Sequence, residues 1–383
     1  LTAAIVLAVV SMCIVPPSAE YAEYIDLDTL ALLFALMAVM KAWQRAGVFG
    51  ALAHRLLKSA NTSRKIAAVL VYLPFFLSMI VTNDVALITF VPFAIIVLKA
   101  AGLEKQVIPV VVLQTLAANL GSMLTPIGNP QNLYLYNRSG MEFWQLMLLM
   151  LPYAAVSALG LAAGILLIKS RPAAAIAAQG AQAGEIRRDR CVEPIIYAGE
   201  RAQNDGDRGA MFGIIWPAIA FCVCLLALFK IVPAIYIAAA MAVFLLIFDR
   251  RTLAAVDYSL LLTFAALFIF IGNMGNIPAV HDMLAGIIDG NELIVAVAAS
   301  QVISNVPAAL LLSGFSSQWN ALIAGCNLGG LGTLIASMAS LISYKTLAAE
   351  YPGLRAKYLG AFTLYNVIFL AVLLGISCIP GLI

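Results

Sequence analysis

Charged residues are scarce in this sequence. Only 11% of its 383 residues are Asp, Glu, Lys or Arg, whereas 63% are hydrophobic, and the mean hydropathy is +1.00. Soluble globular domains carry about 25% charged residues, because a large soluble protein needs polar residues on its surface. The composition therefore excludes a large soluble core and indicates a protein embedded in the lipid bilayer. With a formal net charge of only +3, we expect no nucleic-acid partner.

Histidine is almost absent, which argues against a histidine-based metal site. The two histidines, His54 and His281, lie beside charged neighbours in segments expected at the membrane interface. The six cysteines are scattered, mostly within apolar runs, and we interpret them as small packing residues. The apolar regions contain no Ser–Lys or paired-carboxylate arrangement for catalysis. We therefore expect neither an enzyme nor a cofactor, and consider Na⁺ only as a coupling ion.

The apolar residues form long runs rather than the alternating pattern of a barrel strand, which predicts membrane-spanning α-helices. About 20 apolar residues cross the hydrocarbon core. Residues 1–16 lack the basic start and the cleavage site of a signal peptide, and the sequence leaves open whether a helix precedes Leu1. The predicted full spans are 1–17, 27–44, 143–168, 209–229, 231–248, 256–273 and 358–382.

Four further apolar regions are interrupted. Regions 65–98 and 288–314 carry a small polar cluster at their middle, which predicts re-entrant helical hairpins with polar tips. Regions 107–137 and 319–345 contain Gly, Pro, Asn, Ser and Thr, which predicts discontinuous transmembrane helices. Segment 45–60 has the pattern of an amphipathic helix lying in the cytoplasmic interface.

The distribution of Lys and Arg supports the hairpins. If the N-terminus is cytoplasmic and each hairpin returns to the side it came from, only Arg138 and Lys230 among the basic residues lie outside. This agrees with the positive-inside rule, whereas a full crossing by 65–98 would invert everything after it. We therefore expect a multi-pass protein of the cell membrane, the inner membrane in a bacterium. The predicted cytoplasmic segments are 41–65, 99–106, 169–208, 249–257 and 345–357.

The two halves of the chain resemble each other in sequence. Segment 25–34 (IDLDTLALLF) matches 255–264 (AVDYSLLLTF), and segment 119–128 (NLGSMLTPIG) matches 327–336 (NLGGLGTLIA). The hairpin centres also correspond, so that each half has the same order of elements. The corresponding centres are Thr82-Asn83-Asp84 and Ser304-Asn305-Val306.

The charge pattern opens the first hairpin to the cytoplasm and the second to the outside, so the repeat is predicted to be inverted. Inverted repeats with broken helices at corresponding positions are typical of secondary transporters with a binding site near the bilayer midplane. The expected fold class is an all-α polytopic membrane protein. We expect a first repeat at 1–168, a cytoplasmic linker at 169–208 and a second repeat at 209–383.

The breaks can supply ligands at membrane depth. Freed backbone carbonyls suit Na⁺, and exposed helix N-termini suit an anion. Asn83 and Asn305 both accept and donate hydrogen bonds, so either can serve ion and substrate together. The alternative is that small polar residues only hold helices together, but their recurrence in both halves favours a site. The hydroxyls expected to contribute belong to Thr82, Ser304, Thr125, Thr333, Ser337 and Ser340.

Asp84 is the one ionisable residue deep within an apolar run. Burying an acid in the membrane costs at least ~2.5–3.5 kcal/mol, so such a residue is expected to be functional. It would bind a cation or proton, or stay protonated through desolvation. The alternative is that it caps the free N–H groups of the hairpin turn. The second half has Val306 at this place, so the two half-sites differ chemically.

With these motifs the chain resembles the ion transporter superfamily over essentially its whole length. That group contains citrate-transporter-like proteins, divalent-anion sodium symporters, arsenite permeases and one branch of sodium–proton antiporters. In the divalent-anion symporters, a Ser-Asn-Thr signature at each hairpin tip and a Thr-Pro loop in each broken helix hold two Na⁺ ions and a dicarboxylate. Here both tips lack the final Thr, and the first resembles the arsenite-permease and antiporter branches, where an acid follows the Asn.

The resemblance implies roles for particular residues. Pro126 and Asn129 belong to a loop, 125–132, that is similar to an anion-site loop. Related symporters are dimers, which implies a homodimer here. The Na⁺ sites that the resemblance and the charge of Asp84 imply involve Asn83, Asp84, Gly128, Asn305 and Ala336.

These observations predict a cation-coupled symporter that moves a small anion, most simply an organic carboxylate, by alternating access. The second hypothesis is a Na⁺/H⁺ antiporter or an arsenite-type exporter with Asp84 as the titrating group. No arginine lies in the predicted site, so recognition of a carboxylate would fall to backbone N–H groups and hydroxyls. Substrate, coupling by Na⁺ or H⁺, and stoichiometry stay open.

Overall fold

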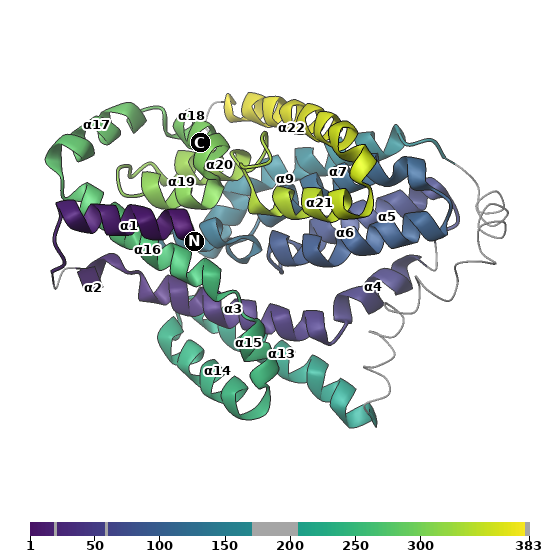
Figure 1. The fold of residues 1–383 in the computed structure, drawn as a ribbon, viewed down its shortest axis with the longest axis horizontal. Helices are drawn as coiled ribbons and strands as arrows, with labels where there is room; N and C mark the ends of the chain where they lie inside the picture. The colour runs from purple at the N-terminus through teal and green to yellow at the C-terminus, as the bar shows by residue number, and fades with distance from the viewer. Residues whose placement is uncertain (19–20, 58–59, 171–205, 380–383) are drawn as a thin grey trace.

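The protein is built of α-helices and short 3-10 turns (Figure 1). The structure, a computed structural model, describes residues 1–18, 21–57, 60–170 and 206–379, and it contains no strand within those ranges. The all-α membrane fold predicted from composition is therefore confirmed. Most of the linker expected at 169–208 lies outside the described residues, as does Cys191.

The first half contains nine helices and two 3-10 turns in the described ranges, including both predicted breaks. They are α1 (Thr2–Ile14), α2 (Tyr21–Tyr24), α3 (Leu27–Arg45), α4 (Val48–Leu57), α5 (Ser63–Leu77), α6 (Asn83–Ala100), η1 (Glu104–Gln106), α7 (Val107–Ser122), η2 (Pro126–Gly128), α8 (Pro130–Ser139) and α9 (Phe143–Leu166).

The second half follows the same order with an additional helix in front. It comprises α13 (Gly206–Leu228), α14 (Ala234–Phe248), α15 (Arg250–Ala255), α16 (Tyr258–Gly275), α17 (Pro278–Ile288), α18 (Glu292–Ile303), α19 (Asn305–Leu312), α20 (Trp319–Leu328), α21 (Met338–Glu350), η3 (Pro352–Leu354) and α22 (Arg355–Ser377).

The four interrupted regions are broken where the sequence predicts. Region 65–98 forms α5 and α6, and region 288–314 forms α18 and α19, which meet at Ser304. Region 107–137 forms α7, η2 and α8, and region 319–345 forms α20 and α21 with an irregular segment between them. Whether the two halves are inverted across the bilayer stays a prediction.

Aspartate caps mark matching helix starts in the two halves. Asp26 accepts a hydrogen bond from the backbone N–H of Thr29 at the start of α3 (2.9 Å). Asp257 accepts one from the N–H of Leu260 at the start of α16 (3.1 Å). Each cap satisfies an N–H group that has no partner within its own helix. The two helices therefore begin in the same way, although Asp26 is the second residue of segment 25–34 and Asp257 is the third residue of segment 255–264.

Five described helices are long and apolar enough to cross a membrane. They are α3, α6, α9, α16 and, together with η3, α22. The pair α17 and α18 meets the same criteria together, but the two helices are bent by 112° at the turn between them. This bend places α17 where an interfacial helix is expected before the second hairpin, as α4 precedes the first.

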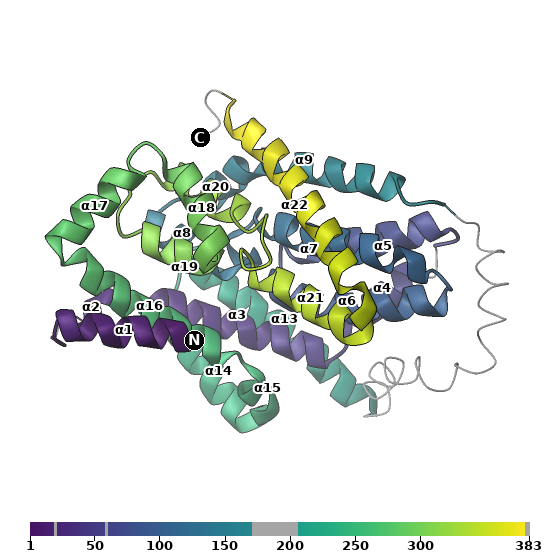
Figure 2. The ribbon, with the colours of Figure 1, turned by 45° about the horizontal axis from the view of Figure 1, so that its top comes forward.

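Helix α7 lies at the centre of the bundle. It packs against α5, α6, α9 and α22, and most of its side chains are buried. Helix α3 packs against α13 and α14, and α16 packs against α1 (Figures 1 and 2). The hairpins and broken helices thus form one packed group, with α3, α13 and α14 beside it.

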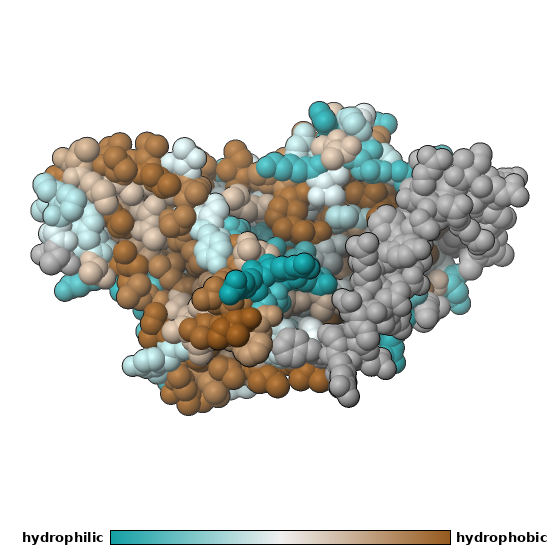
Figure 3. Space-filling model, turned by 60° about the horizontal axis from the view of Figure 1, so that its bottom comes forward, coloured by the Kyte–Doolittle hydropathy of each residue, from teal (hydrophilic) through white to brown (hydrophobic). Residues whose placement is uncertain are grey.

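The outer surface is largely apolar, as expected for helices in lipid. Figure 3 shows the face over α13 and α14, where hydrophobic residues cover wide areas and hydrophilic residues gather in narrower patches. Exposed side chains of α14 include Ile235, Val243 and Phe248. Cysteines are less buried than the packing interpretation required. Cys224 and Cys326 are buried, but Cys13, Cys222 and Cys378 are exposed.

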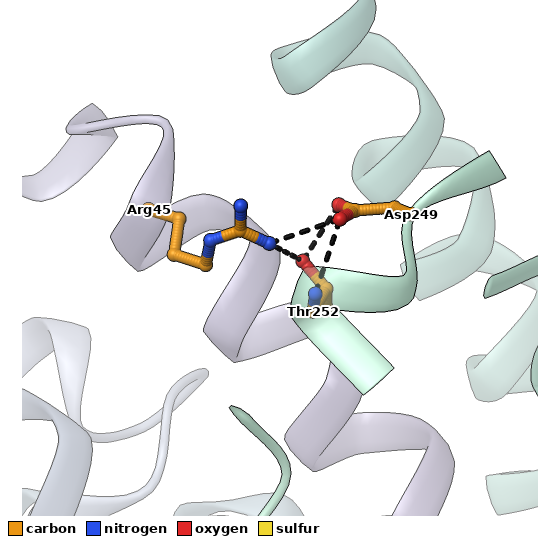
Figure 4. A network of polar contacts seen from close by, with 3 residues as sticks. All are labelled: Arg45, Asp249 and Thr252. Carbon is orange, nitrogen blue, oxygen red and sulfur yellow. Dashed lines mark hydrogen bonds and ion pairs between the residues drawn. The ribbon is translucent and has the colours of Figure 1, made fainter. Parts of the chain in front are cut away.

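A polar network joins the end of α3 to the start of α15 (Figure 4). Arg45 Nη1 donates to Asp249 Oδ1 (2.9 Å) and to Thr252 Oγ1 (2.5 Å). Burial opposes ionisation of Asp249, but the hydrogen bonds from Thr252 and Arg45 outweigh it and hold the pKa of Asp249 below its usual value. All three residues fall in segments predicted to be cytoplasmic.

We predict that Gly121→Ala destabilises the protein. A Cβ at Gly121 would overlap the carbonyl oxygen of Phe75, because α7 and α5 approach each other closely there. Overpacking of this kind typically costs about 1–3 kcal/mol. Gly360→Ala on α22 is the matched control, since Gly360 is exposed and no atom lies within 4 Å of its would-be Cβ. Melting temperatures in detergent should fall for Gly121→Ala alone; equal values would contradict the packing.

Candidate functional site

Four helices begin at the breaks and meet near the centre of the molecule. Helices α6 and α19 begin at the hairpin tips, and α8 and α21 begin after the irregular segments of the broken helices. In Figure 2, α6 and α21 extend to one side of this centre, and α8 and α19 lie on the other. The positive ends of four helix dipoles therefore gather in one place, which favours an anion.

Contacts along each pair show that its helices run side by side in the same direction. Lys99 near the end of α6 forms an ion pair with Glu350 at the end of α21. The hydroxyl groups of Tyr134 in α8 and Ser313 after α19 share a hydrogen bond of 2.8 Å. The starts of α6 and α21 are also linked, through Asn119.

Asn119, near the end of α7, joins the first hairpin tip to the second broken helix. Its Oδ1 accepts hydrogen bonds from Asn83 Nδ2 (3.0 Å) and Ser337 Oγ (3.1 Å). Its Nδ2 donates to Ser340 Oγ (3.2 Å). Ser337 is the N-cap residue of α21, so one side chain holds the starts of α6 and α21 together.

Asn327, near the end of α20, forms the corresponding link from the second half to the broken helix of the first half. Its Nδ2 donates to Asn132 Oδ1 (2.6 Å), and its Oδ1 accepts from Asn129 Nδ2 (3.4 Å). Asn129 is the N-cap residue of α8 and also accepts from the N–H of Asn132 (2.9 Å). The asparagine of each half therefore binds the N-cap residue of the other half's broken helix, and the residue three positions later.

The second hairpin tip lies against the loop before α21. Ser304 has φ 73° and ψ 154°, a sparsely populated conformation for a residue with a side chain. Its hydroxyl donates to the carbonyl oxygen of Ala336 (3.3 Å), and the backbone N–H of Asn305 donates to the same oxygen (3.0 Å). In this conformation the Ala336 carbonyl, expected as a Na⁺ ligand, is bound by the hairpin tip.

The two threonines of the broken helices hold the loops to the hairpins in the same way. Thr125 Oγ1 donates to the carbonyl oxygen of Met79, after α5. Thr333 Oγ1 donates to the carbonyl oxygen of Gln301, in α18 (3.2 Å). Thr333 is exposed, whereas Thr125 is buried. Both hydroxyls therefore already have acceptors, and each retains lone pairs for an ion.

At Gly128 and Gly330 neighbouring atoms come so close that a side chain would collide with them or crowd them. A Cβ at Gly128 would overlap the carbonyl oxygen of Ser122, because η2 folds back on the end of α7 after the buried Pro126. A Cβ at Gly330 would lie 3.0 Å from Asn305 Nδ2. The second loop therefore passes directly beside the asparagine of the second hairpin tip.

Thr82 and Asp84 line a pocket beside the first hairpin tip. Asn129 also lines it, and so do Lys41 from α3 and Asp257 from the start of α16. The backbone N–H of Asp84 donates to Asn83 Oδ1 (2.9 Å), but the Asp84 carboxylate caps nothing among the described residues. Its predicted alternative role as a cap of the hairpin turn therefore finds no support.

The structure gathers most predicted residues into one network but places Asp84 and Thr333 at its margins. Sequence reasoning missed the binding roles of Asn119, Asn327 and Gln301. The two asparagines open the matched segments 119–128 and 327–336, and this repetition was the available signal. Gln301 Nε2 donates to the carbonyls of Gly329 (3.0 Å) and Leu331 (2.9 Å), and no equivalent residue in the first half pointed to it.

The chain has similarities to known transporters. A family whose description is citrate transporter matches residues 1–320. Inner membrane protein YbiR of Escherichia coli is 29% identical over 84% of this chain and 80% of its own length. An uncharacterized transporter of Methanocaldococcus jannaschii is 29% identical over 85% of this chain and 82% of its own length. Silicon efflux transporter LSI3 of Oryza sativa is 32% identical over 33% of this chain and 26% of its own length.

We predict that Asn119 and Ser340 are energetically coupled. Because they share a hydrogen bond between α7 and α21, the double variant Asn119→Ala/Ser340→Ala should lose less stability than the two single variants together. Such bonds in membrane bundles contribute about 0.6 kcal/mol on average. Unfolding in detergent measures the cycle. Ser377→Ala, which removes a bond to Tyr153 on another pair of helices, should be additive with Asn119→Ala.

Proposed function

Because the chain belongs to the citrate transporter family, we propose that this membrane transporter carries a small anion, an organic carboxylate, coupled to Na⁺ or H⁺ by alternating access. The observation that carries the proposal is the meeting of four helix N-termini at Asn83, Asn129, Asn305 and Ser337. An anion there receives backbone and side-chain N–H groups and positive dipole ends without needing an arginine.

The proposed substrate lies between the two hairpin tips. Asn83 and Asn305 are buried and keep amide groups that can donate to a carboxylate. The hydroxyls of Thr82 and Ser304 stand beside them, and Pro126 sets the turn that leads to Asn129. The charge of the substrate is then matched by dipoles and a coupling cation rather than by a fixed basic residue.

The proposed coupling cation lies beside the same tips. Carbonyl oxygens at Gly128 and Ala336 and the amide oxygens of Asn83 and Asn305 are hard ligands of the kind that Na⁺ prefers. Ala336 would have to exchange its present bonds from the second hairpin tip for the ion. Asp84 supplies a negative charge in the first half alone.

Alternating access is proposed to move the hairpins and broken helices as one group against α3, α13 and α14. The crossed links through Asn119 and Asn327 support this, since each joins a broken helix of one half to that of the other. Inverted repeats, a cytoplasmic N-terminus and linker, a bacterial inner-membrane location and a homodimer belong to the same proposal.

A second candidate function is a Na⁺/H⁺ antiporter or an arsenite-type exporter that uses Asp84. Its specific support is the acid after the hairpin asparagine, which lines a pocket rather than capping a helix. One partial relative, the silicon efflux transporter of Oryza sativa, is named for efflux.

Transport by the purified protein in proteoliposomes separates the two candidates. We expect labelled citrate or succinate to accumulate under an imposed Na⁺ or proton gradient and not in its absence. If neither carboxylate moves and an internal pH dye instead responds to added Na⁺, the antiporter replaces the symporter. Arsenite efflux from loaded vesicles would indicate the exporter.

Asn83→Ala and Asn305→Ala should each abolish this uptake, because each removes a ligand for both substrate and ion. Asn276→Ala is the matched control, since in the described part of the chain the Asn276 side chain donates to Tyr24, at the far end of α16 from the hairpin tips. Elution as a single folded peak excludes misfolding. Normal uptake by either hairpin variant would contradict the proposed site.

A further inference from the structure

Three segments that are far apart in the sequence meet where helix α9 ends. Ser63 Oγ at the start of α5 and Gln106 Nε2 in η1 both donate to the carbonyl oxygen of Lys169, at 3.1 Å and 3.2 Å. Arg64 Nη2 donates to the carbonyl oxygen of Ile168, at 3.2 Å. Carbonyl groups at the end of a helix have no partner within that helix, so side chains from two other segments hold the end of α9 in place.

Basic side chains gather around this meeting point. Lys65 follows Arg64 at the start of α5, Lys105 lies in η1, and Lys169 follows α9. All three lysines are exposed, and within the described part of the chain none of them forms an ion pair. Glu104 is the only acidic residue in the three segments. We call Arg64, Lys65, Lys105 and Lys169 the basic patch; its four positive charges face one negative charge.

Helix α4 packs beside the patch, against α5, and is amphipathic. On one side, Phe49 is buried and its ring meets that of Phe90 in α6, with centroids 6.4 Å apart. On the other side, Leu52 and Leu56 are 37% and 40% exposed, and Arg55 is exposed as well. Exposed leucines beside basic side chains are typical of a helix that lies among lipid headgroups with its apolar side toward the acyl chains.

The position of the patch in the fold places it near the surface of the bilayer. Helices α6 and α9 are long and apolar enough to cross a membrane. The patch lies where α9 ends and where α6 turns through η1 into α7. In Figure 2, α4, α5 and the end of α9 lie toward the same end of the molecule. Lipid phosphates are found at this depth, and anionic lipids attract Lys and Arg there.

The corresponding place in the second half has the opposite charge. Helix α17 precedes the second hairpin as α4 precedes the first, and it also exposes apolar side chains, Met283 and Ile287. It contains Asp282 but no basic residue, and residues 252–344 contain no Lys or Arg at all. Residues 29–83, by contrast, contain no Asp or Glu. Charge, rather than hydrophobicity, therefore distinguishes the two places.

We propose that the basic patch, together with α4, binds the headgroup of an anionic phospholipid. The lysines of the patch donate to the lipid phosphate, and the exposed leucines of α4 contact its acyl chains. A soluble anion would have no use for those leucines. The bound lipid anchors the base of the first hairpin, where α4 connects it to α3. No residue of the patch belongs to the proposed transport site, so this inference goes beyond the proposed function and does not depend on it.

The test is native mass spectrometry of the purified protein in detergent, titrated with phosphatidylglycerol or with phosphatidylcholine. We expect phosphatidylglycerol to bind more tightly. Lys65→Gln/Lys169→Gln should weaken its binding about 25-fold, because a basic residue near an anionic membrane surface contributes about 1 kcal/mol, or about fivefold. Arg64 is left unchanged because it binds the end of α9. Lys65→Arg/Lys169→Arg keeps both charges and should bind as the wild type.

Arg138→Gln/Lys230→Gln is the matched control. It removes the same charge at two exposed residues, one in α8 and one after α13, away from the patch. Its affinity for phosphatidylglycerol should equal that of the wild type. Unchanged melting temperatures show that the variants are folded. Equal weakening by the two glutamine variants would mean that only the overall charge matters, and would overturn the proposal.

Three other results would also overturn it. They are equal affinity of the wild type for the two lipids, wild-type affinity of Lys65→Gln/Lys169→Gln for phosphatidylglycerol, and displacement of phosphatidylglycerol by an equal concentration of inorganic phosphate, which would indicate a site for a free anion. The measurement uses no transported substrate. A failure of carboxylate uptake in proteoliposomes would therefore count against the proposed function alone.

Discussion

The breaks in four helices free backbone groups at a depth where the bilayer offers no water to bind them. In this protein the freed carbonyl oxygens are bound by side chains from neighbouring segments. Thr125 binds the carbonyl of Met79, Asn132 binds those of Met123 and Thr125, and Gln301 binds those of Gly329 and Leu331. Polar residues therefore interrupt the apolar runs and also bind the carbonyl oxygens that these interruptions free.

This requirement also ties the two halves together. Asn119 and Asn327 each end the first part of a broken helix, and each binds the N-cap of the broken helix in the other half. These links hold the starts of α6, α21 and α8 around one centre, and the bonds of Ser304 and Asn305 to the Ala336 carbonyl add the start of α19. A site that relies on helix N-termini needs this fixed geometry, because dipole effects fall off within the first turn. On the proposed function, binding the freed backbone groups and binding a ligand are two uses of one network.

Much of this arrangement could be predicted from the sequence, because the same order of elements occurs in both halves of the chain. The breaks, their boundaries to within a few residues, and the match of the two hairpin tips follow from polar clusters in apolar runs. The partners of those clusters could not be predicted. Asn119 and Ser337 form a hydrogen bond although more than half of the chain separates them. Gln301 binds the carbonyls of Gly329 and Leu331, and no repeated pattern in the sequence indicates these contacts. Charge counting places Lys41 in the cytoplasmic segment 41–65, because hydropathy and charge do not show which pocket a helix end faces.

Asp84 and the helix N-termini act in opposite directions on a bound anion. The helix N-termini favour an anion, yet an ionised Asp84 beside them repels one, and in a low-dielectric site the repulsion is substantial. On the proposed function, a proton or Na⁺ at Asp84 removes this repulsion, so that the cation and the anion each raise the affinity of the other by the same factor. Coupling then needs no moving relay between distant sites. It follows from placing one acid, absent from the second half, beside an anion site that both halves build.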